Sequence, residues 1–372
     1  MRTPAGGWTP PPYPYDRLAP LRDKAAALPG GVVDLSIGDP GDPPPPEVVA
    51  TLASSGTERG YPTSVGSPAF RAAAAAWVAT RFGVDVAPSS VGACVGTKEF
   101  VTGLPGWLKL RDPRRDTVLF PAVSYPSYAM GALLARCRAV PVPVDAGFRT
   151  DLSAISATDA EHALCLWVNT PGNPAGGLDD LDAAAAWGRE HDVIVVSDEC
   201  YAEFTWAGAP RTVLASGLDG VLAVHSLSKR SNLAGVRSGF YAGDPSLMEF
   251  LLEVRKHAGL MTPGPVMAAA AVALGDQAHV EAQRHRYAER LARLAQVVAG
   301  AGAPAPLPEG GFYLWVPAPD GDAWGLVARL AADGGLLGSP GEFYGEAGQD
   351  HVRLAAVAPI ERLDLVAARL GQ

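Results

Sequence analysis

Five short apolar runs alternate with longer stretches of helical pattern from residue 91 onward, and this alternation constrains the fold more than any other feature of the chain. The runs are VGACV (91–95), DTVLF (116–120), ALCLWV (163–168), VIVVS (193–197) and VLAVH (221–225). Strands that are apolar on both faces are typical of a mainly parallel sheet covered by helices. Because ligands bind such sheets at the carboxyl ends of the strands, the residues just after each run are candidates for a functional site.

A smaller α/β unit is predicted in the last hundred residues. A helical pattern from Asp276 to about Ala299 is followed by the stretch GAGAPAPLPEG, whose glycines and prolines are typical of a domain boundary. Beyond it the pattern predicts a strand at FYLWV, a helix at Asp322–Asp333, a strand at His351–Val357 and a closing helix after Pro359.

The domain organisation follows from these patterns. At roughly 150 residues per domain, a chain of 372 residues has room for two domains. We predict a large domain at 46–275, a small domain at 276–372, and an N-terminal arm at 1–45 that joins the small domain. The proline-rich segment Pro10–Pro14 is expected to run as an extended arm over the surface.

Charge and composition argue against several classes of partner. The 39 acidic and 30 basic side chains give a net charge of −9, which repels polyanions, so we expect no nucleic-acid partner. The first twenty residues show no basic segment followed by an apolar one, and no uncharged apolar run reaches about 18 residues, so we expect a cytoplasmic protein without a membrane partner. The four cysteines are widely spaced, and neither a disulfide framework nor a metal site is indicated.

The run VLAVH leads into SLSKRSNLAGVRSGF, which places two serines, a lysine and an arginine just past a strand end. A lone lysine in a loop is usually a solvated charge. Here Lys229 lies beside Ser226 and Ser228, and Arg237 follows eight positions later between two glycines. An amine that forms a Schiff base with an anionic cofactor needs hydroxyls and a fixed cation nearby, so this context favours a cofactor-binding lysine.

The motif S-L-S-K followed by G-V-R-S-G resembles the lysine signature of the class I and II aminotransferases, which use pyridoxal 5'-phosphate. The resemblance extends from about Val33 to the C-terminal helix. It implies an α/β protein of fold type I, with a mainly parallel seven-stranded sheet flanked by helices and a smaller C-terminal α/β domain. It also implies that Lys229 carries the cofactor as a Schiff base and moves the substrate proton. Ser226 and Arg237 would bind the phosphate, with Ser228 in support.

Two further strand ends match the family's contacts to the cofactor ring. After VIVVS, the pair Asp198-Glu199 could be an ordinary helix cap. The pattern D-E-x-Y instead resembles the family's pyridinium site, in which Asp198 would pair with the ring nitrogen and Tyr201 would bond the phenolic oxygen. A carboxylate at that place keeps the ring protonated and able to accept carbanion charge. After ALCLWV, the turn-like segment N-T-P-G-N-P supplies Asn173 for the same oxygen and for the substrate, although Ala175 replaces the family's usual threonine.

Three other positions are expected to contact the cofactor. Gly96-Thr97-Lys98 precedes a predicted helix, whose first N–H groups can cradle a phosphate. Tyr125, in Y-P-S-Y, could be a packing residue, but its family position implies stacking on the ring. Tyr61, in G-Y-P-T-S-V-G, could be a surface aromatic. The resemblance implies instead that it reaches the phosphate of a neighbouring subunit, in a homodimer with active sites at the interface.

Substrate recognition points to Arg353 in the strand DHVRLAAV. Alternation sends Arg353 to the face opposite Val352 and Leu354, where it could simply face solvent. The pair of motifs P-G-E-F-Y-G and H-V-R-L resembles the family's C-terminal signature, whose arginine binds the substrate α-carboxylate in a bidentate fork. Tyr344 stands where phenylalanine is usual. Gly38, in LSIGDP, matches a glycine whose backbone touches the same carboxylate.

Longer segments indicate a subfamily. SLSKRSNLAGVRSGF, VRKHAG and GGFYLW resemble N-succinyldiaminopimelate aminotransferases of lysine biosynthesis, which implies amino transfer between glutamate or 2-oxoglutarate and N-succinyl-LL-2,6-diaminopimelate. A distal carboxylate would need a second cation, for which Arg230, Arg255 and Lys256 are candidates, although the last two are expected on a solvated helix face. The alternatives are an aspartate or other amino-acid aminotransferase, a β-lyase of the same fold, and a non-catalytic ligand sensor.

Overall fold

The computed structural model describes residues 8–372 and contains a central seven-stranded sheet. Its strands lie in the order β2 (Val91–Cys94), β8 (Gly239–Gly243), β7 (Val221–Ser226), β6 (Ile194–Asp198), β5 (Ala163–Asn169), β3 (Thr117–Pro121) and β4 (Arg138–Val142). Strand β8 runs antiparallel to β2 and β7, and the remaining neighbours are parallel. The predicted mainly parallel, seven-stranded sheet is therefore confirmed.

Two of these strands were not among the five apolar runs. Strand β4 lies at the sheet edge and is only partly buried, so its sequence RAVPV lacks a continuous apolar signal. An edge position also tolerates Pro141, which has no N–H to donate. Strand β8, GFYAG, has a glycine at each end and follows directly on the lysine motif. In both cases the neighbouring strands decide the conformation more than the local pattern does.

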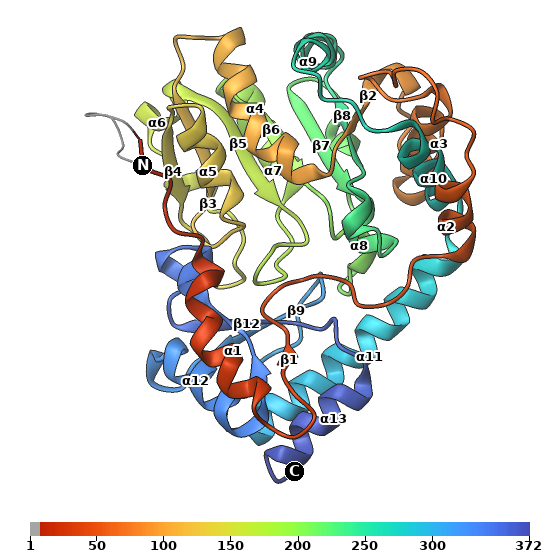
Figure 1. Ribbon diagram of the computed structural model, residues 1–372. Coiled ribbons are helices and arrows are strands. Elements are labelled where there is room, and N and C mark those ends of the chain that lie inside the picture. Colours follow the sequence, from red (N-terminus) through yellow and green to blue (C-terminus); the bar gives the residue numbers. More distant parts are fainter. Residues whose placement is uncertain (1–7) are drawn as a thin grey trace.

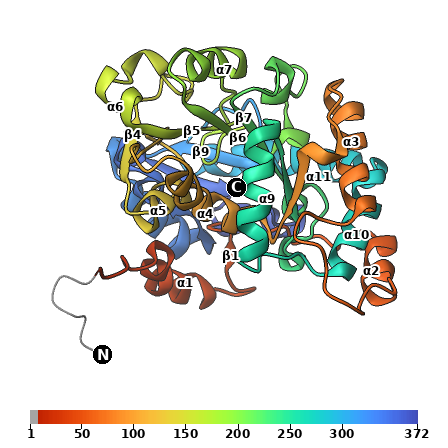
Figure 2. The same ribbon diagram turned by 90° about the horizontal axis from the view of Figure 1, so that it is seen from above.

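Helices cover both faces of the sheet (Figures 1 and 2). One face carries α4 (Thr97–Arg111), α5 (Ser127–Leu134) and α9 (Pro245–His257), and the other carries α3 (Pro68–Phe82), α7 (Leu181–Glu190) and α10 (Gly264–Gly275). The strands supply alternate residues to the two layers, so that Val195 packs in one cluster and Val196 in the other. Helices α2 (Pro46–Ala53) and α6 (Ala157–His162) and the single turn α8 (Leu227–Arg230) also belong to this part of the chain.

The C-terminal residues form a second α/β layer, built on the antiparallel sheet β11 (Ser339–Pro340), β12 (His351–Ala355) and β9 (Tyr313–Pro317). Its helices are α11 (Ala278–Gly300), α12 (Ala323–Arg329), which continues into a π-helical turn at Leu330–Gly334, and α13 (Ile360–Arg369). The four elements predicted beyond residue 300 are all present, with boundaries shifted by a few residues. Figure 1 shows this layer in blue beneath the central sheet.

The N-terminal segment packs with these C-terminal elements. Helix α1 is Ala19–Ala26, and β1 (Val33–Asp34) pairs with β10 (Leu336–Leu337). Leu18 and Ala25 belong to the same core cluster as Leu314 and Leu363. We propose on this basis that the arm belongs to the small domain, and the division at residues 45 and 275 stays a prediction. Residues 1–7 of the predicted arm lie outside the described part of the chain. Nowhere in residues 8–372 is there a helix both long and apolar enough to span a bilayer.

Candidate active site

A cavity of about 610 Å³ lies at the carboxyl ends of β5, β6 and β7. It brings together twelve of the predicted site residues, drawn from segments that span the chain: Gly38, Thr97, Lys98, Tyr125, Asn173, Asp198, Tyr201, Ser226, Ser228, Lys229, Arg237 and Arg353. Gly96 adjoins the cavity next to Arg237. Tyr61 does not line it, and its side chain is 97% exposed. Sequence motifs separated by more than 300 positions therefore converge on one site.

Lys229 lies on the single turn α8 (Leu227–Arg230), directly after β7. Ser226 caps this turn by accepting the N–H of Ser228 at 3.1 Å. The Lys229 amine donates a hydrogen bond to the carbonyl oxygen of Gly38. Burial lowers the pKa of Lys229 to about 8, and the positive charges of Arg353 and Arg237 act in the same direction. A substantial fraction of this amine is therefore neutral near physiological pH, as a nucleophile must be.

Asp198 ends β6 with its carboxylate at the cavity wall and is 6% exposed. Its Oδ2 accepts the hydroxyl of Tyr128 at 2.9 Å, and its Oδ1 accepts the backbone N–H of Cys200 at 3.1 Å. Burial raises the pKa of Asp198. No salt bridge to Asp198 is present among residues 8–372. A buried carboxylate without a cationic partner fits the protonated ring nitrogen of pyridoxal phosphate, which would supply the missing charge.

Another part of the cavity lining is suited to a phosphate. Gly96 caps α4 with a φ of 71°, and Arg237 lies in the left-handed region with a φ of 60°. A Cβ atom at position 96 would collide with the Arg237 guanidinium, so the glycine lets this cation approach the helix N-terminus. The hydroxyls of Thr97, Ser226 and Ser228 belong to residues that line the same region. A helix N-terminus and a guanidinium together form an anion site.

Asn173 and Tyr201 line the cavity but have different partners within the chain. The Oδ1 of Asn173 accepts a hydrogen bond from Arg353 at 2.8 Å, and its N–H donates to Oδ1 of Asn169 at 2.8 Å. The hydroxyls of Tyr201 and Tyr313 share a hydrogen bond of 2.8 Å. Their predicted contact with a cofactor oxygen therefore remains a proposal.

Arg353 occupies a buried aromatic cage in β12. It is 3% exposed, and its guanidinium carbon lies 4.3 Å from the Tyr313 ring centroid and 4.6 Å from that of Tyr344. It donates to Oδ1 of Asn173 at 2.8 Å and to the carbonyl oxygen of Ser36 at 2.6 Å. Its Nε–H is buried and has no acceptor among residues 8–372. The predicted alternation is correct, but both faces of the strand are buried, so the arginine does not face solvent.

Gly38 allows a close approach beside this arginine. A Cβ atom at position 38 would lie 2.7 Å from Cζ of Tyr313, closer than two carbon atoms can approach. The Tyr313 ring is at the same time bonded to Tyr201 and stacked on Arg353. The glycine is thus required by the packing of the arginine cage.

The three cations suggested for a distal carboxylate lie elsewhere. Arg230 is buried and pairs with Glu203 at 3.2 Å. Arg255 was expected on a solvated face, and this was wrong: its side chain is fully buried and pairs with Glu99 at 2.6 Å. Helix α9 turns that face toward Phe100, Trp107 and Tyr241, whose rings surround the guanidinium. Lys256 is exposed. None of the three lines the cavity.

Several neighbours of the cavity carried no sequence signal of their own. Tyr313 and Ser36 contact Arg353, and Tyr128 contacts Asp198. Tyr13 and Tyr15 reach the cavity from the N-terminal arm, whose prolines Pro11, Pro12 and Pro14 line its mouth. Residues 8–13 form neither helix nor strand, but the extended arm predicted for Pro10–Pro14 ends earlier, because Pro14 begins the 3-10 helix Pro14–Leu18. The segment borders the site as well as the surface. Only the position of an aromatic within a known motif could have identified Tyr128 or Tyr313.

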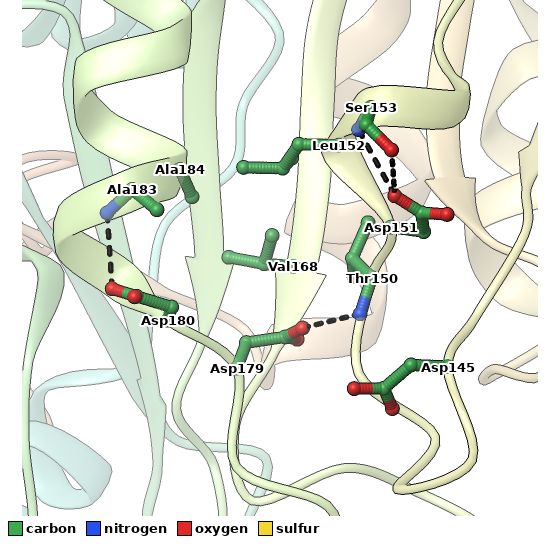
Figure 3. Close-up of a pocket in the computed structure, with 10 residues that line it drawn as sticks. All are labelled: Asp145, Thr150, Asp151, Leu152, Ser153, Val168, Asp179, Asp180, Ala183 and Ala184. Atoms are coloured by element: carbon green, nitrogen blue, oxygen red, sulfur yellow. Dashed lines mark hydrogen bonds between the residues drawn. The ribbon is translucent and has the colours of Figure 1, made fainter.

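A second cavity, of about 320 Å³, is lined by four aspartates beside β5 (Figure 3). Asp179 accepts the N–H of Thr150 at 2.7 Å, Asp151 accepts that of Ser153 at 3.0 Å, and Asp180 caps α7 by accepting that of Ala183 at 3.0 Å. These carboxylates hold loop and helix ends in place. Within the described residues, no group of acidic, histidine or cysteine side chains could hold a metal ion.

Comparisons with known proteins agree with the geometry. A family model for the class I and II aminotransferases matches residues 30–370. The chain is 44% identical to the 4-dedimethylamino-4-oxo-anhydrotetracycline transaminase OxyQ of Streptomyces rimosus, over 97% of this chain and 99% of that protein. It is 33% identical to an LL-diaminopimelate aminotransferase of Desulforudis audaxviator, over 95% and 93% respectively.

A solved structure has the same fold. The probable N-succinyldiaminopimelate aminotransferase of Thermus thermophilus superposes with a TM-score of 0.88 at 30% identity, covering 96% of this chain and 99% of that one. The fold, the residues gathered around Lys229 and these relatives lead to one conclusion. The chain belongs to the class I and II aminotransferases, fold type I enzymes that use pyridoxal 5'-phosphate.

Proposed function

We propose that this aminotransferase transfers the amino group of an α-amino acid such as glutamate to a second substrate that carries a carbonyl group. The observation that carries the proposal is Arg353, a buried guanidinium in the same cavity as Lys229. Among residues 8–372 it has neutral acceptors and an unused Nε–H, but no carboxylate. A substrate α-carboxylate would complete this set through two parallel hydrogen bonds.

The roles of the other site residues belong to the same proposal. Bound pyridoxal phosphate supplies a ring that stabilises negative charge on the substrate α-carbon. Lys229 Nζ would take the proton from that carbon and pass it to the cofactor's aldehyde carbon, and it would carry a proton in the opposite direction in the second half of the reaction. Asp198 holds the proton on the ring nitrogen, Tyr201 and Asn173 donate to the ring oxygen, Tyr125 covers the ring, and Gly38 lies beside the α-carboxylate. The phosphate would be held by Gly96, Thr97, Lys98, Ser226, Ser228 and Arg237.

One candidate for the second substrate is the keto form of N-succinyl-LL-2,6-diaminopimelate, which would be aminated as glutamate becomes 2-oxoglutarate. Its support is the resemblance of the lysine motif and the similarity to enzymes named for diaminopimelate and its succinyl derivative. Its distal carboxylate would need a cation, but Arg230, Arg255 and Lys256 do not reach the cavity. The four cations that line it, Lys98, Lys229, Arg237 and Arg353, already have other roles in this scheme.

The second candidate is an acceptor with an aromatic or apolar body. The cavity lining includes aromatic and aliphatic side chains from several segments: Tyr13, Tyr15, Ile37, Tyr125, Met130 and Leu133. Such a wall stabilises apolar surface removed from water. The relative at 44% identity is named for a tetracycline ketone. The described lining therefore favours this candidate over one with a distal carboxylate.

We also propose that the protein is a cytoplasmic homodimer. Tyr61 is almost fully exposed in one chain, as a residue that serves a neighbouring site would be. Mixing Tyr61→Ala with Lys229→Ala protomers tests this, because a hybrid dimer would contain one site with both residues intact. Activity above that of either variant alone is expected. If the mixture is no more active than the two variants measured separately, the site does not combine residues of two protomers.

Amino transfer is tested by following glutamate-dependent turnover with a panel of acceptors: the keto form of the succinylated substrate, oxaloacetate, and polycyclic aromatic ketones. The visible spectrum of the loaded enzyme should change when glutamate is added alone. Turnover of aromatic ketones but not of the succinylated acceptor would select the second candidate. Robust turnover of oxaloacetate alone would exclude both, and release of ammonia and pyruvate from cystathionine would reveal a β-lyase.

Lys229→Ala should bind the cofactor but lose turnover by at least about 10⁴-fold, because it removes both the covalent anchor and the proton-transfer group. Lys256→Ala, a change to an exposed lysine, is the matched control and should leave turnover unchanged. Substantial activity in Lys229→Ala would disprove the assignment of this lysine.

A further inference from the structure

Tyr128 lies behind the cavity wall and touches neither the cavity nor solvent. It is fully buried on α5, and its ring stacks on Trp167 of β5 with centroids 5.0 Å apart and planes 20° apart. Its hydroxyl lies 2.9 Å from Oδ2 of Asp198, which is its one hydrogen bond among residues 8–372. Packing against Trp167 requires only the ring of Tyr128. It does not explain why the hydroxyl forms its hydrogen bond with the Asp198 carboxylate.

The direction of the hydrogen bond follows from its surroundings. Burial and the nearby Asp198 raise the pKa of Tyr128 well above its ordinary value, so the phenol keeps its proton and donates. The backbone N–H of Cys200 donates to the other oxygen, Oδ1. Both oxygens of the carboxylate are thus held from the protein side, and the plane of the group is fixed. The remaining lone pairs are left for a donor in the cavity.

We propose that Tyr128 is a positioning residue, which orients the Asp198 carboxylate toward the ring nitrogen of pyridoxal phosphate. The inference rests on the proposed role of Asp198. In the competing explanation Tyr128 is a core residue that fills space beside Trp167, and its hydroxyl has no influence on the cofactor. The two explanations make different predictions for loss of the hydroxyl. If Tyr128 positions Asp198, the loss weakens binding only of ligands that have the ring nitrogen.

The test compares two ligands with the cofactor-free protein: pyridoxal phosphate, and an analogue in which a C–H replaces the ring nitrogen. Tyr128→Phe removes the hydroxyl and keeps the ring. We expect roughly 10-fold weaker binding of pyridoxal phosphate, the loss of one hydrogen bond to a charged group, and unchanged binding of the analogue. Equal weakening of both ligands, or of neither, would overturn the inference.

Tyr241→Phe is the matched control, because Tyr241 is also fully buried and its hydroxyl has no hydrogen-bond partner in residues 8–372. It should leave both affinities unchanged. Unchanged binding of the analogue by Tyr128→Phe also shows that this variant folds, so that poor folding cannot be mistaken for a loss of positioning.

Asp198→Asn distinguishes a failure of the proposed role of Asp198 from a failure of the proposed role of Tyr128. It should weaken binding of pyridoxal phosphate and spare the analogue. If it affects both ligands equally, the proposed role of Asp198 is wrong. If it is selective and Tyr128→Phe is not, Asp198 keeps its role and the inference about Tyr128 is wrong.

Discussion

Two arginines lie buried among aromatic rings in this protein, one in each part of the chain. Arg353 lies in the cavity between Tyr313 and Tyr344, at 4.3 and 4.6 Å. Arg255 lies on α9, with its nearest ring, Trp107, at 5.0 Å. The two differ in their acceptors. Arg255 bonds both carboxylate oxygens of Glu99, at 2.6 and 3.0 Å, whereas Arg353 bonds only neutral oxygens.

The difference separates a buried charge that is paired within the chain from one that the described residues leave without a carboxylate. Removing a guanidinium from water is unfavourable unless a carboxylate compensates it. The fold supplies that carboxylate to Arg255 and also to Arg230, through Glu203. At Arg353 the described residues supply only neutral acceptors, and in the proposed function the substrate would supply the carboxylate. Pairing, more than burial, therefore distinguishes the candidate site from the core.

Among the changes that test this comparison of the two arginines, Arg353→Met is expected to have the largest effect. It should lower kcat/KM for amino-acid substrates about 1,000-fold, because two hydrogen bonds to a charged group are lost. Unfolding of the cofactor-free protein should require as much urea as before, or more, since an uncompensated charge is removed. A primary amine that lacks the carboxylate should react equally with both proteins. A stability loss without an activity loss would reverse the assignment.

Arg255→Met should show the opposite behaviour. It leaves the Glu99 carboxylate without its cation and should lower the free energy of unfolding by about 3 kcal/mol. This is toward the lower end of the range for buried pairs, because the Glu99 side chain is 23% exposed. Urea denaturation of the cofactor-free protein measures this. The folded fraction should retain kcat/KM within about threefold, since Arg255 contacts no residue with an assigned role. A selective rise in KM would indicate a substrate role after all.

A double variant sharpens the comparison at Glu99. Glu99→Gln removes the stranded charge but keeps an oxygen for the backbone N–H of Val95, which Glu99 accepts at 2.9 Å. In the Arg255→Met background it should recover about 1 kcal/mol of stability. In the wild-type background it should destabilise. Additivity of the two single changes in a double-mutant cycle would show that the ion pair is not the source of the effect.

The smallest effect concerns Lys229, whose pKa burial lowers to about 8. The rate at which cofactor-free protein captures pyridoxal phosphate should rise with pH through about 8, as the amine loses its proton. Arg353→Met should move this midpoint to higher pH, because a nearby positive charge is removed. Arg255→Met should not move it. The pH dependence of the capture rate distinguishes the two arginines by their distance from the amine.

Much of the fold and the centre of the site could be predicted from the sequence. Strands with two buried faces are long apolar runs, so β3, β5, β6 and β7 are visible in the sequence, and the residues after them are found at the cavity. Lys229, Asp198 and Asn173 were identified because motif and strand end coincide. The edge strand β4 was not predicted, because a partly exposed strand lacks a continuous run of apolar residues.

The partners of the site residues could not be predicted. Tyr128 and Asp198 are 70 positions apart, and Arg353 and Ser36 are 317 apart, so only the packed structure brings them together. The prediction that Arg255 lies on an exposed helix face was wrong for the same reason. Helical periodicity shows that a charged residue lies on a given face, but it does not show that three aromatic rings from other elements cover that face.

The close approach of Gly38 to Tyr313 limits the order in which this site can change during evolution. Any side chain at position 38 meets the Tyr313 ring, so that ring must become smaller before position 38 can become larger. A smaller residue at 313 removes the hydroxyl bonded to Tyr201 and one wall of the Arg353 cage. Positions 38, 201, 313 and 353 therefore form one epistatic unit. A lineage that acquires a different substrate can vary the cavity mouth residue by residue, but it must replace this unit as a whole.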